Sequence, residues 1–317
     1  MKKNILITGG AGFIGSNLVD KLLKDERVGK VRVLDNLSTG FYSNIERFSE
    51  NPAFEFIKGD IVSYEQCVSA CKGMQLISHQ AALGSVPRSI QDPITTNTVN
   101  IGGTLNVFTA AKNSGIERII YAASSSTYGS SNESPKIENI IGSPLSPYAI
   151  TKYVNELYAN VFKSLYNVDF IGLRYFNVFG PYQNPGGEYA AVIPIFVNSI
   201  LKNTAPVING DGSVSRDFTY VENAVQANVL GLFTQDSISL NQVYNIACGQ
   251  STTLNDLFFT LKNISESQLI PQHGKNRIGD IQHSLADISK ARKLLGYSPS
   301  VNVQEGLERT YLWYSKL

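Results

Sequence analysis

The stretch TGGAGFIGS, residues 8–16, places glycines at positions 9, 12 and 15. A short apolar segment, residues 4–8, precedes it, and the pattern that follows predicts a helix. In such a strand–turn–helix unit, glycine permits the tight turn, lets the backbone approach a pyrophosphate and lets the helix pack closely on the strand. The free N–H groups at the start of the helix then bind the anion. The spacing differs by one residue from the commoner G-x-G-x-x-G, so an ordinary turn is the alternative.

A carboxylate further along the chain supports dinucleotide binding. Asp35 ends the predicted strand in VRVLDN, twenty positions after Gly15, where a carboxylate accepts hydrogen bonds from an adenosine ribose. It would repel the 2′-phosphate of NADP, and no arginine follows immediately, which favours NAD. The next residues would wrap the ribose and phosphate, and GDI, residues 59–61, would border the adenine, although its aspartate could instead cap the next helix. These cofactor candidates are Asn36, Ser38, Thr39, Gly40, Asp60 and Ile61.

Short apolar runs alternate with amphipathic stretches along the chain. One amphipathic stretch, residues 154–165, repeats its apolar side chains at the spacing of one helix face. This alternation predicts βαβ units and a parallel sheet with helices on both faces, wound doubly by right-handed crossovers. We therefore predict an α/β fold: a doubly wound parallel Rossmann sheet with a smaller mixed α/β C-terminal lobe. The predicted strands are residues 4–8, 31–34, 54–57, 76–79, 118–122, 170–174 and 242–246.

The sequence changes character after about residue 179, where turn residues multiply in GPYQNPGG and INGDGS. We predict a NAD-binding Rossmann domain over residues 1–178, to which residues 217–247 return. Residues 179–317 are predicted to form mainly a substrate domain.

Composition narrows the functional classes. The 317 residues carry a net charge of +1, without the basic surface expected of a nucleic-acid-binding protein. No apolar run approaches the roughly 18 residues that span a bilayer, and the N-terminal run is too short for a signal peptide, so we predict a cytoplasmic protein. Cys67, Cys71 and His79 could be imagined as metal ligands. Without a fourth ligand at zinc-like spacing, half-buried thiols are favoured and no metal site is predicted.

Seven motifs in order make the chain similar to a known family. They are TGGAGFIG, LDN, GDI, HQAA, SSSTYG, SPYAITKY and LRYFNVFGP. Over essentially its whole length, the chain resembles the extended short-chain dehydrogenase/reductases. INGDGSVSRDFTYVEN and RIGDIQHSLADISKARKLLGY resemble their sugar-nucleotide epimerase branch. HQAALGSVPRSI and SPLSPYAITKYVNELYA are most similar to the UDP-N-acetylglucosamine 4-epimerases.

The resemblance implies a catalytic set of Ser124, Tyr148 and Lys152. A Tyr-x-x-x-Lys alone occurs often by chance, but the spacing of four puts both side chains on one helix face. The resemblance makes Tyr148 the general base toward the sugar 4′-hydroxyl. Lys152 would lower the pKa of that phenol and bind the nicotinamide ribose, while Ser124 would hydrogen-bond the same sugar oxygen. The implied reaction interconverts UDP-GlcNAc and UDP-GalNAc through a 4-keto intermediate, with NAD held tightly and regenerated in each cycle.

Further contacts follow from the resemblance, position by position. The implied cofactor contacts are Gly9, Gly12, Phe13, Ile14 and Gly15 in the glycine loop, Gln80, Ala81 and Ala82 beside the nicotinamide, and Tyr175 and Val178 closing over it. The implied contacts to the UDP group are Asn177, Arg216 and Arg277 on the diphosphate, and Ala191, Val192, Asn209 and Asp280 on the uridine. The implied lining of the sugar pocket is Gly84, Ser85, Ser125, Ser126 and Ser284.

The resemblance also bears on specificity. Ser284 stands where enzymes acting on plain glucose and galactose carry a tyrosine, which leaves room for a 2-acetamido group, so N-acetylated UDP-hexosamines are the predicted substrates. UDP-glucose/galactose 4-epimerase is an alternative. A 4,6-dehydratase would usually carry Asp-Glu where Ser125 and Ser126 stand, and a UDP-glucuronate decarboxylase would need a carboxylate-binding arginine, for which Arg88 is conceivable. A non-catalytic NAD-binding regulator commonly lacks the tyrosine or the lysine, and here both are present.

A homodimer is the predicted assembly. The helices around residues 100–114 and 148–166 have apolar faces, and in the resembling family these two helices pair across a two-fold axis as a four-helix bundle. The alternative is that both faces simply pack on the sheet.

Overall fold

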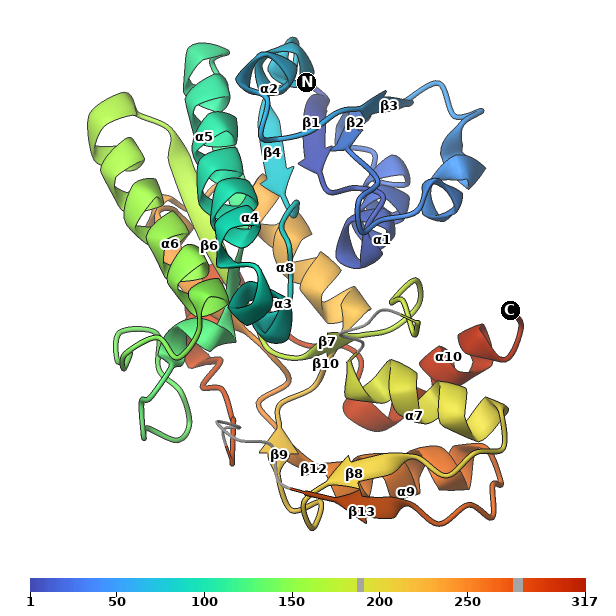
Figure 1. Ribbon diagram of the computed structural model, residues 1–317. Coiled ribbons are helices and arrows are strands. Elements are labelled where there is room, and N and C mark those ends of the chain that lie inside the picture. Colours follow the sequence, from blue (N-terminus) through green and yellow to red (C-terminus); the bar gives the residue numbers. More distant parts are fainter. Residues whose placement is uncertain (187–190, 276–281) are drawn as a thin grey trace.

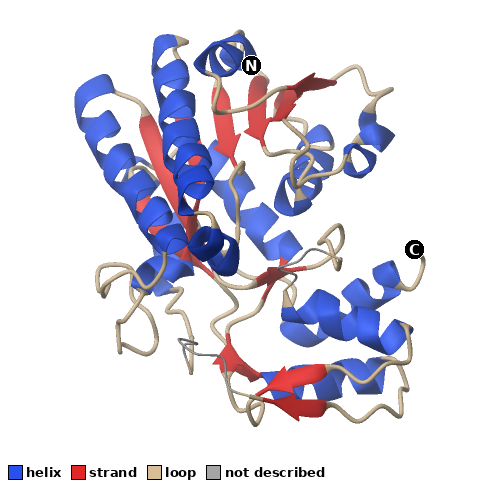
Figure 2. Ribbon diagram, viewed as in Figure 1, coloured by secondary structure: helices blue, strands red, loops and turns tan. Residues whose placement is uncertain are grey.

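A computed structural model of the chain describes residues 1–186, 191–275 and 282–317. The strands of its largest sheet are β1 (Lys3–Thr8), β2 (Val28–Asp35), β3 (Phe54–Lys58), β4 (Leu76–His79), β5 (Arg118–Ser124), β6 (Asp169–Tyr175) and β11 (Gln242–Ile246). They lie in the order β11–β6–β5–β4–β1–β2–β3, and every neighbouring pair is parallel. The predicted Rossmann sheet is confirmed, and each predicted strand lies within one of these seven (Figure 2).

Side chains alternate across this sheet and build a hydrophobic core on each face. In β1, Ile5 and Ile7 belong to one core and Leu6 to the other. The helices α1 (Phe13–Leu23) and α8 (Val221–Phe233) cover the Ile5 face. The opposite face is covered by α2 (Tyr64–Cys71), α5 (Thr104–Asn113) and α6 (Pro147–Tyr166) (Figure 1). Cover on both faces explains why the strands read as nearly continuous apolar runs.

A smaller lobe follows the large sheet. Its strands pair as β8 (Val207–Asn209) with β13 (Gln272–Gly274), and β9 (Ser215–Arg216) with β12 (Thr252–Thr253). The pair β7 (Val178–Phe179) and β10 (Thr219–Tyr220) lies between this lobe and the large sheet (Figure 1). The helices of the smaller lobe are α7 (Val192–Leu201), α9 (Leu254–Ile264) and α10 (Val303–Tyr314). Residues 217–247 are the segment predicted to return to the Rossmann domain. Within them, α8 packs on the large sheet and β11 is its edge strand. The domain division at residue 178 stays a prediction.

Helix α6 is apolar on two sides, not on the single face that its spacing predicted. Phe162 is buried against the sheet, whereas Leu157, Val161 and Leu165 are exposed at 47%, 51% and 64%. The buried side also holds the polar residues Lys152 and Glu156. The exposed side chains therefore form a stripe that the sheet does not cover. None of the helices in the described ranges is both long and apolar enough to cross a membrane.

Short elements complete the fold around α5 and α6. They are α3 (Val86–Gln91), α4 (Pro93–Asn97) and the π-helical turn η3 (Thr98–Gly103), followed further along by the 3₁₀ turn η4 (Ser125–Tyr128).

Cys67 and Cys71 are fully buried on α2, deeper than the half-buried position predicted for them. Burial disfavours the thiolate and raises the pKa of both thiols to about 12.

Candidate active site

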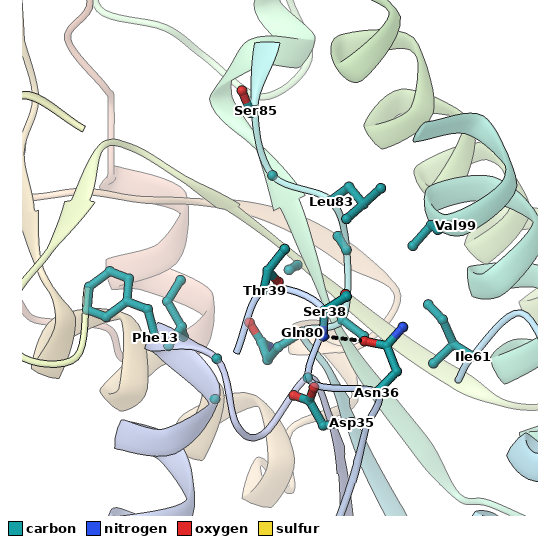
Figure 3. Close-up of a pocket in the computed structure, with 18 of the residues that line it drawn as sticks. Phe13, Asp35, Asn36, Ser38, Thr39, Ile61, Gln80, Leu83, Ser85 and Val99 are labelled. Carbon is teal, nitrogen blue, oxygen red and sulfur yellow. Dashed lines mark hydrogen bonds between the residues drawn. The ribbon is translucent and has the colours of Figure 1, made fainter. Parts of the chain in front are cut away.

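A cavity of about 490 Å³ opens at the carboxyl ends of the parallel strands (Figure 3). The chain builds β1, β2 and β3 outward in one direction and then returns to place β4, β5 and β6 on the other side of β1. Ligands of open α/β sheets bind at such a reversal of strand order. The volume is in the range usual for small-molecule and cofactor sites.

The glycine loop after β1 forms one wall of the cavity. Gly9 has a φ of +72°, and a Cβ there would lie 2.6 Å from the backbone nitrogen of Ala81. A Cβ on Gly15 would lie 2.1 Å from the carbonyl oxygen of Gly9. Helix α1 starts at Phe13 after Gly12, without a side-chain cap, so its first N–H groups remain available to an anion. The close approaches require glycine, and the free N–H groups at the start of α1 fit a pyrophosphate.

Asp35, the predicted ribose ligand, is fixed at the end of β2 by backbone hydrogen bonds. It is 8% exposed, and its carboxylate accepts hydrogen bonds from the backbone N–H of Ala11 at 2.9 Å and of Leu37 at 2.8 Å. Burial raises the pKa of Asp35, and these two hydrogen bonds oppose the rise. The carboxylate lines the cavity with its remaining acceptor capacity (Figure 3), which fits the hydroxyl groups of a ribose.

The neighbouring loop carries the other residues predicted to contact the adenosine. Asn36 donates to Asp60 at 2.8 Å. It also accepts from the backbone N–H of Ser38 at 2.9 Å (Figure 3). Asp60 also accepts from the N–H of Val62 at 2.8 Å, and it lines the cavity. The alternative role, as a cap of the next helix, is wrong, because Ser63 is the N-cap of α2 and accepts from the N–H of Gln66. Gly40 does not line the cavity; a Cβ there would lie 2.7 Å from the backbone of Ala11, and it therefore supports the glycine loop from behind.

The sequence SPY places Tyr148 at the start of α6. Ser146 caps the helix by accepting from the N–H of Ala149 at 3.1 Å, and Pro147 is the first helical residue. This arrangement is typical of helix starts. It puts Tyr148 in the first turn, and the N–H of Tyr148 donates to Ser89 Oγ at 3.0 Å. The phenol therefore stands at the positive end of the helix dipole.

Lys152 and Ser124 lie beside this phenol and also line the cavity. Lys152 Nζ donates to the carbonyl of Ala122 at 2.8 Å and lies 5.9 Å from the centroid of the Tyr148 ring. Ser124 ends β5, and its Oγ accepts from the N–H and the hydroxyl of Ser126 at 3.1 and 2.9 Å. The predicted catalytic residues are therefore brought together from a strand end and one helix face.

The pKa values of this group are set mainly by burial. Enclosure by the cavity walls raises the pKa of Tyr148, and a hydrogen bond with Ser124 opposes the rise. Burial lowers the pKa of Lys152 to about 8. The sequence led us to expect that Lys152 and a positive nicotinamide ring lower the pKa of Tyr148. The protein's own groups raise this pKa, because desolvation of the phenolate is the largest contribution.

Comparison of the chain with known proteins identifies its family. Residues 5–247 match the family described as NAD dependent epimerase/dehydratase. The chain belongs to this family. The chain is 38% identical, over 98% of its length and 97% of the other chain, to a putative UDP-glucose 4-epimerase of Methanocaldococcus jannaschii.

Solved structures agree with this membership. The UDP-N-acetylglucosamine 4-epimerase from Methanobrevibacter ruminantium M1, in complex with UDP-N-acetylmuramic acid, is 40% identical with a TM-score of 0.93, and 99% of each chain is covered. The UDP-glucose 4-epimerase of Thermotoga maritima, solved with UDP-glucose, is 36% identical with a TM-score of 0.92, again with 99% of each chain covered. The family depends on NAD, and the glycine loop and Asp35 fit that cofactor.

The structure brings most of the predicted cofactor residues of this epimerase/dehydratase to the cavity. Apart from Gly40, all of them line it, and from the predicted substrate set Gly84, Ser85 and Asn177 do so as well. Asn177 also donates from its side chain to the carbonyl of Asp217 at 3.1 Å. Sequence reasoning missed the lining residues Leu34, Phe41, Asn44, Gly59, Leu83, Val99, Ala122, Ala123, Tyr182 and Asn184. Several of these adjoin predicted motifs, and Leu83 directly follows HQAA, so motif proximity is the signal that could have found them.

The remaining predicted substrate residues lie outside this cavity lining. They are Ser125 and Ser126 in η4, Ala191 and Val192 at the start of α7, Asn209 at the end of β8, Arg216 in β9, and Ser284, whose N–H donates to the carbonyl of Ser215 at 3.2 Å. Arg277 and Asp280 fall outside the described residues.

Proposed function

We propose that this member of the epimerase/dehydratase family interconverts UDP-GlcNAc and UDP-GalNAc by epimerisation at C4, as an NAD-dependent sugar-nucleotide 4-epimerase. The observation that carries the proposal is the grouping of Ser124, Tyr148 and Lys152 at a cavity whose other end carries the glycine loop and Asp35. The names of the similar proteins support a UDP-sugar 4-epimerase, and they divide between N-acetylated and plain hexoses.

The chain's own residues would handle the proton. When bound, NAD supplies the hydride acceptor and donor for the sugar carbon. Tyr148 takes the proton of the sugar hydroxyl and later returns it, while Ser124 holds the same oxygen. Lys152 is charged below its pKa of about 8, and its ammonium favours the phenolate. The first turn of α6 adds the positive end of its dipole at the same place.

The preference for an N-acetylated sugar rests on Ser284. This residue is small, half-buried and held beside β9 by its hydrogen bond to Ser215. A tyrosine at this position would occupy the space proposed for the acetamido group. Steric exclusion from a shaped pocket changes the rate ratio of two substrates by about tenfold to a few hundredfold.

The test is to incubate the protein with UDP-GlcNAc and, separately, with UDP-glucose, and to separate the sugar nucleotides formed. We expect UDP-GalNAc from the first incubation, and we expect Ser284→Tyr to lose this activity by tenfold or more while sparing UDP-glucose. Ser298→Tyr, at an exposed serine of the C-terminal segment, is the matched control. An unchanged substrate preference in Ser284→Tyr would reject the sugar assignment, whereas no epimer from either substrate would reject the proposed reaction.

Dehydration and decarboxylation are less well supported. Among the described residues, the carboxylates that line the cavity are Asp35 and Asp60, and both lie at the adenosine end, far along the cavity from the tyrosine in our assignment. A dehydratase needs an acid near the reacting sugar. Arg88 lies on α3 and is not among the described lining residues. Release of CO₂ from UDP-glucuronate, or formation of a 4-keto-6-deoxy sugar, would favour these alternatives over epimerisation.

We also propose that two copies pair through α6. Its exposed apolar side chains form one stripe along the helix; they are Ile150, Leu157, Val161 and Leu165. Ile90 and Ile94, on the adjoining helices α3 and α4, are exposed at 64% and 79%. A second copy related by a two-fold axis would bury the same stripe on both sides. Val161→Lys should convert a dimer to a monomer in sedimentation, whereas the control Lys163→Ala should not; a wild-type monomer would reject the pairing.

A further inference from the structure

Asn228 lies in α8, fully buried behind the cavity. Its side-chain nitrogen donates to the Tyr175 hydroxyl at 2.7 Å and to the Ala224 carbonyl at 2.8 Å. Its side-chain oxygen accepts from Ser78 Oγ and from Gln80 Nε2, each at 3.0 Å. An asparagine side chain offers two donors and one oxygen with two lone pairs, so this amide is completely satisfied.

Three of these side chains close a ring of hydrogen bonds. Asn228 donates to Tyr175, the Tyr175 hydroxyl donates to Gln80 Oε1 at 3.2 Å, and Gln80 Nε2 donates back to Asn228. The direction of the ring follows from one fixed group. The Ala224 carbonyl can only accept, so the amide nitrogen of Asn228 must face it and the amide oxygen must face Gln80. This orientation then decides which way the tyrosine hydroxyl points.

The ring controls what two of its members present to the cavity. Gln80 and Tyr175 line the cavity, whereas Asn228 does not. Gln80 uses its amide nitrogen on Ser78 at 2.9 Å and on Asn228, and Tyr175 uses its hydroxyl proton on Gln80. All donor hydrogens of these two side chains are therefore occupied, and their oxygens retain spare lone pairs. Oxygen lone pairs attract a cationic ring more than a neutral one.

We propose that Asn228 is a positioning residue for the nicotinamide end of the cofactor. Through the hydrogen-bond ring it keeps the donor hydrogens of Gln80 and Tyr175 turned away from the cavity and their oxygens turned toward it. The inference rests on the proposed function, in which the nicotinamide lies beside these two side chains. Asn228 itself touches neither the cavity nor the reacting atoms, and it belongs to none of the sequence motifs of the family resemblance.

The test compares ligands with and without the nicotinamide. Dissociation constants for NAD, NADH and ADP-ribose are measured by calorimetry on the full-length protein freed of copurified nucleotide. Asn228→Leu leaves the hydroxyl of Tyr175 and the amide of Gln80 free to reorient, so it should weaken NAD binding about tenfold, which corresponds to about 1.4 kcal/mol. NADH binding should weaken less, because its ring is neutral. ADP-ribose, which lacks the ring, should bind as it does to the wild type.

Asn223→Leu is the matched control. Asn223 is another fully buried asparagine of α8, and its side chain bonds the backbone at Ser300 and Val301, away from the cavity. It should lose stability without changing the ratio of the NAD and ADP-ribose constants. Tyr175→Phe removes the hydroxyl from the ring while Asn228 remains, and it should reproduce the selective loss of NAD affinity even if Asn228→Leu fails to fold.

The outcomes distinguish a failure of the positioning role of Asn228 from a failure of the proposed function. Equal weakening of NAD and ADP-ribose in the folded variants, or unchanged NAD binding, would overturn the positioning role. A wild-type protein that binds no NAD would instead reject the proposed function, whatever the variants do. The inference would be supported if Asn228→Leu and Tyr175→Phe selectively lost NAD affinity while Asn223→Leu kept the wild-type ratio of NAD to ADP-ribose binding.

Discussion

The cofactor end of the cavity and the smaller lobe are built in different ways. Asp35, Gln80, Ser124 and Tyr175 each stand at or next to the carboxyl end of a strand in one seven-stranded sheet. The candidate substrate residues of the smaller lobe instead lie on two- and three-residue strands, in loops or at the start of a helix, such as Arg216 on β9 and Val192 on α7. A large sheet with a core on both faces fixes its strand ends relative to one another. We therefore expect the catalytic and cofactor-binding side chains at the sheet to be held in fixed relative positions, and the substrate-binding residues of the smaller lobe to shift more easily.

The largest effect should come from removing the proposed base at the sheet. Tyr148→Phe keeps the ring and its packing but has no hydroxyl to exchange a proton. General acid–base catalysis contributes about 10²–10⁴-fold to rates, so kcat should fall by about a thousandfold. Because glycine loop and Asp35 are untouched, the NAD content of the purified protein should stay the same. Product separation after long incubation measures the first quantity, and nucleotide release on denaturation measures the second.

Lys163→Ala serves as a control for this variant, since that lysine is exposed near the far end of α6. A Tyr148→Phe protein that turned over UDP-GlcNAc at the rate of this control would contradict the assignment. Such a result would reject Tyr148 as the base but would not affect the assignment of the glycine loop and Asp35 to cofactor binding.

The glycine loop gives the second largest effect. A Cβ at Gly15 would meet the backbone of Gly9 at 2.1 Å, and backbone cannot yield as a flexible side chain does. Gly15→Ala should therefore lower the free energy of unfolding by about 3 kcal/mol and abolish NAD binding. Gly102→Ala, where a Cβ would meet nothing within 4 Å, should leave both unchanged. Chemical denaturation and calorimetry check the pair, and equal behaviour of the two variants would contradict the tight packing.

The same contrast explains what the sequence could predict. The seven strands were predictable because strands buried on both faces are apolar runs, and the cofactor residues adjoin them in short motifs. The positions of Arg216 and Ser284 relative to the cavity depend on how distant segments pack, which no local pattern encodes. The raised pKa of Tyr148 comes from burial, and Asn228 is one of several polar residues in α8, outside every motif. Neither leaves a signal in the sequence.

Asp217 joins the two regions and should make stability depend on pH. Fully buried, its carboxylate accepts from the backbone N–H of Cys248 and Gly249 at 3.0 Å, and of Ala286 at 3.3 Å. Burial raises its pKa to about 6, against these hydrogen bonds. Between about pH 4 and 6 the folded protein therefore binds more protons here than the unfolded chain, and stability falls as pH rises, by up to about 3 kcal/mol.

Asp217→Asn removes this titration and isolates its contribution. The free energy of unfolding is measured by urea denaturation of both proteins from pH 4 to 7. The advantage of the wild type over the variant should shrink as pH rises through the window, because only the wild type must ionise a buried group. A constant difference would mean that the carboxylate titrates with its ordinary pKa and that the junction is insensitive to acid.

The smallest effect should come from the substrate lobe. Arg216 Nη1 donates to the Ser215 carbonyl at 2.9 Å, and we assign the charge of Arg216 to the substrate diphosphate. Hydrogen bonds to charged groups contribute about 1.5–3 kcal/mol, so Arg216→Ala should raise KM for the UDP-sugar by tenfold or more and change kcat little. Arg309→Ala, at an exposed arginine paired with Glu222 and Glu305, is the control. If Arg216→Ala lowered NAD affinity as well, the two regions would not be independent, and the contrast between a rigid cofactor end and a separate substrate lobe would fail.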